Sequence, residues 1–72
     1  MDKYEKLKSQ ILRETKWCIQ NIDENHGGIG LPENLSFSDF IGNNDYPMDE
    51  YERGMLFAYL SLKSEIEAIE KQ

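Results

Sequence analysis

The sequence has few β-branched residues apart from isoleucine, since it contains no valine and a single threonine. The isoleucines stand mostly at helical spacing, so few segments have the composition of a β-strand. Cysteine is equally scarce, and Cys18 has no partner with which to form a disulfide. A lone cysteine is compatible with a reducing compartment but does not require one. These absences favour an all-α protein without disulfides.

Long apolar runs are also absent. The most apolar stretch, residues 54–62, is less than half as long as the ~20 residues that span a bilayer. The first sixteen residues carry charges throughout, including Lys3, Lys8 and Lys16, and lack the apolar region of a signal peptide. We therefore expect a soluble protein of the cytoplasm.

Basic residues are scarce after the first third of the chain. The net charge is −6, and residues 25–72 contain three Lys or Arg against nine Asp or Glu. A surface of this kind repels the phosphates of nucleic acids and attracts basic proteins. Direct binding of nucleic acid is therefore not expected, whereas a basic protein partner is.

Three segments are predicted to be helical in a single domain that spans residues 1–72. Apolar residues recur every three or four positions in the first part of the chain, which predicts a helix at about 2–24. The connection, residues 25–47, is rich in glycine and asparagine and is predicted to carry a short helix at about 37–41. A second long helix is predicted at about 49–70.

Two of the predicted helices have a recognisable start signal. Ser36 precedes the short helix with Asp39 three residues further on, and Asp49 precedes the last helix with Glu52 in the capping-box position. Pro47 also permits a slightly earlier start of the last helix. We predict that the two long helices form an antiparallel hairpin, with the connection laid over it.

The last helix is predicted to be apolar on two sides. Its main stripe, expected to be buried, comprises Met48, Tyr51, Met55, Ala58, Tyr59, Leu62, Ile66 and Ile69. Leu56, Phe57 and Leu60 are expected to point away from this stripe. Because the connection is too short to cover both sides of the hairpin, one apolar patch is expected to contact another copy of the chain in a dimeric helical bundle. The predicted oligomer interface consists of Gly54, Leu56, Phe57, Ala58, Leu60 and Ser61.

A run of carboxylates and aromatic rings between residues 39 and 52 is the main candidate for binding another protein. Carboxylates interleaved with aromatic side chains can imitate phosphates flanked by bases, and so occupy a basic nucleic-acid channel. Trp17 is expected on the solvent side of the first helix unless Phe37 or Phe40 covers it, and tryptophan is enriched at binding hot spots. The predicted partner-binding residues are Trp17, Asp39, Phe40, Asp45, Tyr46, Asp49, Glu50 and Glu52.

No motif indicates catalysis, a metal site or a cofactor. Cys18 and His26 are the only residues of their types, and they are predicted to be a core residue and a helix-end residue. The glycines that follow His26 lack the subsequent Gly-Lys-Ser/Thr of a phosphate loop. The segment from Asp39 to Glu50 lacks a ligand and the glycine that a calcium loop requires. We therefore predict no catalytic residues, no metal and no cofactor.

The last third of the chain, DEYERGMLFAYLSLKSEIEAIE, has tyrosine and glycine three residues apart and an amphipathic tail. It resembles the C-terminal helix of small uncharacterised accessory proteins that bacteriophages and prophages encode. The resemblance implies a protein of the host bacterial cytoplasm that acts by binding. Such a protein blocks a host enzyme, inhibits a defence nuclease as anti-CRISPR proteins do, or sequesters a nucleotide signal.

We therefore predict a non-catalytic inhibitor that binds a bacterial host or defence protein and occludes its basic site. One alternative is an oligomeric sponge for a nucleotide signal, for which Arg53 and Lys63 are available, together with Arg13 or Lys16 of a neighbouring chain. The other alternative is a structural oligomerisation module without a foreign partner.

Overall fold

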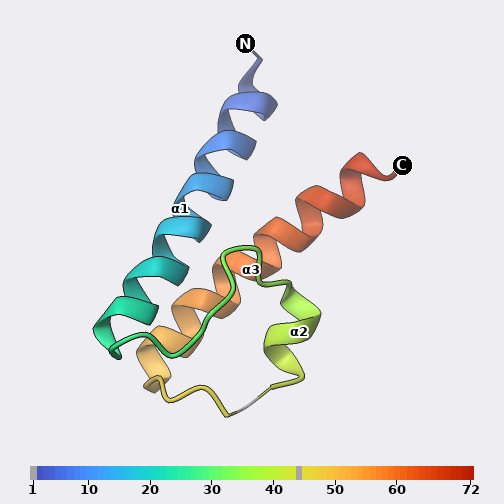
Figure 1. The fold of residues 1–72 in the computed structure, drawn as a ribbon. Helices are drawn as coiled ribbons and strands as arrows, with labels where there is room; N and C mark the ends of the chain where they lie inside the picture. The colour runs from blue at the N-terminus through green and yellow to red at the C-terminus, as the bar shows by residue number, and fades with distance from the viewer. Residues whose placement is uncertain (1, 44) are drawn as a thin grey trace.

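The computed structural model describes residues 2–43 and 45–72 and contains three helices in this part of the chain. Helix α1 comprises Lys3–Asn25, α2 comprises Phe37–Ile41 and α3 comprises Glu50–Glu70. Helices α1 and α3 run antiparallel as the two arms of a hairpin, and both chain ends lie at the same end of the molecule (Figure 1). No strand occurs among the described residues, so the prediction of an all-α fold is confirmed.

Helix α1 is delimited by a carboxylate at its start and by glycines after its end. The Asp2 side chain accepts a hydrogen bond from the Glu5 backbone N–H at 2.8 Å. After α1 the chain turns at Gly27 and Gly28, whose φ angles of 73° and 84° are rarely adopted by residues with a Cβ atom. The Gly28 N–H donates to the Asp23 carbonyl at 2.8 Å and so closes the last turn.

Helices α2 and α3 begin at the capping residues that the sequence indicates. The Ser36 hydroxyl accepts a hydrogen bond from the Asp39 N–H at 3.1 Å, and α2 ends before Gly42. At the start of α3 the capping box is complete. The Asp49 carboxylate accepts from the Glu52 N–H at 2.8 Å, while the Glu52 carboxylate accepts from the Asp49 N–H at 3.1 Å.

Three side-chain contacts tie α1 or its C-cap to α3 along the hairpin. The outer two, Lys8 with Glu70 and His26 with Glu52, pair the start of one helix with the end of the other, and the central one links Glu14 to Tyr59. In the central contact the Tyr59 hydroxyl donates to a Glu14 carboxylate oxygen at 3.0 Å, and this hydrogen bond raises the pKa of Tyr59. Together the contacts fix the register of the two long helices.

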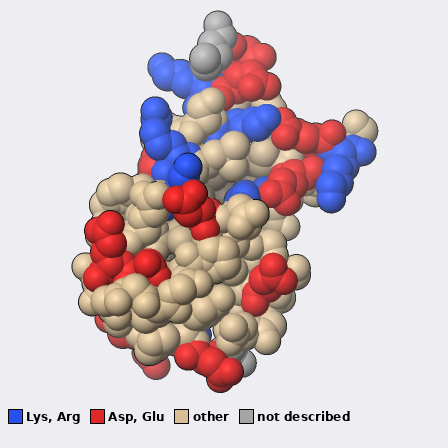
Figure 2. Space-filling view, viewed as in Figure 1, with Lys and Arg blue, Asp and Glu red and all other residues tan. Residues whose placement is uncertain are grey.

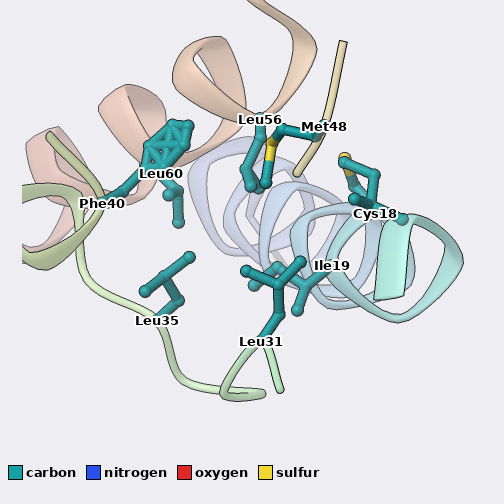
Figure 3. Close-up of a cluster of buried hydrophobic side chains, with 9 residues drawn as sticks. Cys18, Ile19, Leu31, Leu35, Phe40, Met48, Leu56 and Leu60 are labelled. Carbon is teal, nitrogen blue, oxygen red and sulfur yellow. The ribbon is translucent and has the colours of Figure 1, made fainter. Parts of the chain in front are cut away.

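The connection between α1 and α3 covers one side of the hairpin and supplies much of the core (Figures 1 and 3). Its first part is held to α1 by the Asp23 carboxylate, which accepts hydrogen bonds from the N–H groups of Gly30 and Leu31 at 2.9 and 3.1 Å. The connection then places buried apolar side chains against both long helices. This cluster contains Leu31, Leu35, Phe40 and Met48 from the connection, Cys18, Ile19 and Ile22 from α1, and Leu56 and Leu60 from α3.

The side of α3 that enters the core differs from the prediction. Leu56 and Leu60, which were expected to point away from the hairpin, are fully buried. Of the stripe that was expected to be buried, Met48 and Ile66 are buried and Met55 and Tyr59 pack against the core, but Tyr51, Leu62 and Ile69 are exposed. The physical reason is that the connection packs against the flank of α3 that carries Leu56 and Leu60, and so leaves the opposite flank uncovered.

The same packing exposes part of the predicted stripe on α1. Cys18 and Ile22 of that stripe are buried, as is the flanking Ile19, but Tyr4 and Leu7 near the chain start are exposed. Figure 1 shows that the two long helices diverge toward the chain ends, whereas the connection crosses the hairpin nearer its other end. The core is therefore concentrated where the connection crosses the hairpin.

Candidate functional site

Negative charge is concentrated in the half of the molecule that holds the connection. Residues 14–61 contain nine Asp or Glu but only two Lys or Arg, whereas the remaining residues at the chain ends contain five acids and six bases. In Figure 2 the Lys and Arg side chains gather over the part that carries the chain ends, while Asp and Glu occur in both halves. The molecule therefore has an acidic end, opposite its termini.

Both bases of this half already have partners. Lys16 lies 3.9 Å from the Glu33 carboxylate, and the Arg53 guanidinium donates to the Tyr46 carbonyl at 2.5 Å. The carboxylates of Asp39, Asp45 and Glu50 are exposed and form no ion pair within the described residues. We refer to these three residues as the acidic cluster.

Glu52 was predicted to bind a partner, but its side chain makes contacts within the fold instead. Its carboxylate oxygen lies 2.7 Å from His26 Nε2, and the same oxygen accepts from the Asp49 N–H. The hydrogen bond from His26 is the main cause of a lowered pKa for Glu52, with the Asp49 N–H second. Its side chain is only 13% exposed. Glu52 and Asp49 thus act in capping α3 and in joining it to α1.

Two of the predicted aromatic contacts are not available on the surface. Phe40 is buried in the core, and Tyr46 is half-buried against it. The idea that these rings flank the carboxylates as bases flank phosphates is therefore wrong for Phe40. The reason is that α2 packs against α3 and directs the Phe40 ring into the core beside Leu60.

An apolar groove of about 270 Å³ opens on the surface of the same half of the molecule. It is lined by Phe40, Ile41, Arg53 and Phe57, and so runs between α2 and α3. Ile41 and Phe57 are each about half exposed, and the Phe57 ring packs edge-on against Phe37 with their centroids 5.1 Å apart. Sequence reasoning placed Phe57 in an oligomer interface and did not identify Ile41.

Of the acidic cluster, Glu50 is the residue that helix geometry places beside this groove. It precedes Phe57 by two turns on the same side of α3, whereas Asp39 stands two residues before Ile41 in α2, a spacing that directs the two side chains to different sides of that helix. The groove thus combines exposed apolar side chains with one carboxylate that forms no ion pair among the described residues. We refer to it as the α2–α3 groove.

Trp17 is exposed, as predicted, and neither Phe37 nor Phe40 covers it. It lines a second groove of about 370 Å³ between α1 and α3, together with Asn21, Met55, Tyr51 and Asp49 among others. This groove lies on the opposite flank of α3 from Ile41 and Phe57. The structure therefore separates Trp17 from Asp39, with which it was predicted to act.

A third groove, of about 270 Å³, has a more polar lining. Lys16 and Lys63, two of the cations considered for nucleotide binding, both line it with Glu33. Arg53 lies in the α2–α3 groove instead. The structure therefore brings together two of the four candidate cations of the nucleotide-sponge hypothesis.

The remaining candidate groups are distributed without a reactive arrangement in the described residues. Cys18 is fully buried, and burial raises the pKa of its thiol. No three His, Cys, Asp or Glu side chains of the described residues are arranged to hold a metal ion. Neither long helix, over its described residues, is apolar enough along its length to cross a membrane.

The chain was compared with known protein families, with curated proteins and with solved structures. None of the three comparisons gives a match. The candidate sites are therefore defined by the geometry and charge of this chain alone.

Proposed function

We propose that this chain is a non-catalytic binding protein that captures a basic surface of a bacterial protein and blocks it. One observation carries the proposal: the acidic half contains nine carboxylates against two bases, and both bases already have partners. The choice of a bacterial target rests on the resemblance of the last third of the chain to accessory proteins of bacteriophages.

The α2–α3 groove is the proposed contact surface. Ile41 and Phe57 supply apolar area, Glu50 supplies a carboxylate beside it, and Asp39 and Asp45 add to the negative charge of the same half. Rim charges mainly accelerate association with a partner of opposite charge, whereas desolvated apolar contacts slow dissociation. A basic segment with an apolar side chain at its centre matches this surface. Occlusion of the partner's own binding site is then steric.

The proposal is tested by capture from a bacterial lysate with the charge-reversal variant Asp39→Lys/Glu50→Lys. The matched control is Glu5→Lys/Glu67→Lys, which makes the same change in net charge near the chain ends. Asp49 is left in place because it caps α3. We expect the original chain and the control to retain the same basic protein, and the variant to retain it about tenfold less or weaker still, since steering by charge changes association rates by 10–10³.

Three further results decide the outcome. Phe57→Ala should weaken capture without changing the salt dependence of binding, because it removes apolar area and no charge. Circular dichroism should show the same helical content for all variants. Equal capture by the acidic-cluster variant and the original chain would refute the proposal, as would recovery of no foreign protein.

A nucleotide-binding function is the second candidate, favoured by the position of Lys16 and Lys63 along one groove. Glu33 in the same groove weakens it, because its carboxylate lies 3.9 Å from the Lys16 ammonium. Native mass spectrometry of the purified chain tests this function directly. A retained mass of nucleotide size that disappears in Lys63→Gln, but persists in the control Lys71→Gln, would support it.

A further inference from the structure

Both long helices carry exposed apolar side chains that the connection does not cover, and we call these residues the open face. It consists of Tyr4, Leu7 and Trp17 on α1 and Tyr51, Leu62 and Ile69 on α3, each between 38% and 77% exposed. Trp17 and Tyr51 line the same groove between the two helices. The connection packs on the other flank, where Lys16 contacts Glu33 and Leu60 is buried.

On α3 the open face follows the spacing of a helix that packs against another helix. Apolar residues stand at intervals of four, three, four and seven along this flank, which is a heptad pattern. The row consists of Tyr51, Met55, Ala58, Leu62 and Ile69. Glu65 is the single position at which a charge interrupts it. A row of this kind predicts a helical partner rather than a small molecule.

The area of the open face agrees with that of a stable interface between proteins. Buried aromatic side chains each contribute about 150–250 Å². At the exposed fractions given above, and with areas of this size, the six side chains together offer on the order of 500–800 Å², which approaches the ~800 Å² that each partner contributes to a standard interface. An isolated chain would leave this apolar area in contact with water.

The charge distribution specifies both the occupant and its orientation. A second copy placed in the same direction would bring two acidic halves together, each with nine acids and two bases. A copy placed in the opposite direction sets each acidic half beside the chain ends of the other, where six bases stand among five acids. Only the antiparallel arrangement is electrostatically favourable.

We propose that a second copy of this chain occupies the open face in the antiparallel orientation, which forms a four-helix bundle. The α3 helices of the two copies then lie side by side, with Ala58 of one copy opposite Leu62 of the other and Tyr51 opposite Ile69. The small Ala58 leaves room for the larger Leu62 in this register, which also sets Met55 opposite Glu65, the one charged position of the row. The interface differs from the one predicted from sequence, because Leu56 and Leu60 are in the core of each chain.

This arrangement leaves the α2–α3 groove uncovered in both copies. The two acidic clusters lie at opposite ends of the bundle, so the assembly presents two separate surfaces for a basic partner. The inference shares with the proposed function the charge of the acidic half, but the apolar residues that it uses lie on the opposite flank of α3, so different variants test the two.

Sedimentation velocity of the full chain, over a range of concentrations, tests the inference. We expect a dimer that Leu62→Glu dissociates, with at least a hundredfold increase in Kd. The matched control is Phe57→Glu, a residue of the same helix with nearly the same exposure on the other flank, which should leave the dimer intact. A monomeric original chain, or dissociation by Phe57→Glu and not by Leu62→Glu, would overturn the proposal.

The orientation is tested by spin labels on Gln72→Cys in a Cys18→Ser background. Antiparallel copies place the labels at opposite ends of a molecule whose long dimension is 38 Å, so a long inter-label distance is expected. Labels that lie within about half that separation would show a parallel dimer and contradict the charge argument. Capture of a basic protein by the monomeric Leu62→Glu variant would show that the proposed function does not depend on the dimer, so that each proposal can fail without the other.

Discussion

Glu52 Oε1 lies 2.7 Å from His26 Nε2 and joins the C-cap of α1 to the first turn of α3. The two residues are 26 positions apart, and the contact closes the lower end of the hairpin. The same carboxylate completes the capping box of α3. The Glu52 side chain therefore both caps the start of α3 and connects it to the end of α1.

Glu52 should make stability depend on pH on the acid side. Its pKa is lower in the folded chain than in the unfolded chain, so its contribution is complete above the unfolded pKa and is lost as pH falls through the folded pKa. Glu52→Gln should lower Tm at neutral pH and reduce the loss of Tm on acidification. Thermal unfolding followed by circular dichroism from pH 7 to pH 3 measures both. If Tm of Glu52→Gln falls on acidification as steeply as that of the original chain, other carboxylates account for the loss of stability in acid.

Leu60→Ala should strongly destabilise the fold. Leu60 is fully buried, and truncation of a buried leucine typically costs about 2–5 kcal/mol. Leu62→Ala removes the same atoms from a side chain of the same helix that is 45% exposed, and should cost much less. Urea denaturation at a protein concentration low enough for the chain to be monomeric gives both free energies of unfolding without a contribution from the proposed dimer seam, which contains Leu62. Equal losses would contradict the assignment of these two leucines to core and surface.

Two glycine substitutions should have opposite effects. Gly28 has a φ of 84°, so Gly28→Ala should destabilise the chain by about 1–2 kcal/mol, although a Cβ there would meet no atom within 4 Å. Gly54 lies inside α3 and also has open space around it, so Gly54→Ala should stabilise by about 1 kcal/mol. Thermal unfolding should show a lower Tm for Gly28→Ala and a higher Tm for Gly54→Ala than for the original chain. Destabilisation by Gly54→Ala would indicate that something packs closely on that side of α3.

Moderate salt should stabilise the folded chain. The acidic half has an excess of seven negative charges, and added salt screens their mutual repulsion. Tm should therefore rise between 0.02 and 0.2 M NaCl, concentrations over which the Debye length falls from roughly 20 to 7 Å. The variant Asp39→Asn/Asp45→Asn/Glu50→Gln should start from a higher Tm and show a smaller increase. A fall in Tm on addition of salt would mean that the ion pairs between α1 and α3 outweigh the repulsion.

The helix boundaries were predictable because they depend on neighbouring residues. Ser36 and Asp39, or Asp49 and Glu52, are three positions apart, and each pair forms the hydrogen bond that its spacing indicates. Trp17 was correctly placed on the solvent side of α1 for a similar reason. Helical periodicity assigns a face to each residue without reference to the rest of the chain.

The covered flank of α3 was not predictable in this way. Periodicity showed two apolar flanks, one with Leu56 and Leu60 and the other with Tyr51 and Leu62, and the longer stripe with Tyr51 and Leu62 was expected to be the buried one. The path of the connection decides, and that path depends on contacts of Leu31 and Leu35 with residues far away in the chain. The pairing of His26 with Glu52 escaped prediction for the same reason.

The position of both chain ends at one end of the hairpin has a practical consequence (Figure 1). A fluorescent protein, an affinity tag or a solid support attached at either terminus lies far from Ile41 and Phe57. Immobilised or fused chains therefore present the α2–α3 groove outward, and the hairpin can be inserted into a surface loop of a host scaffold as a display unit.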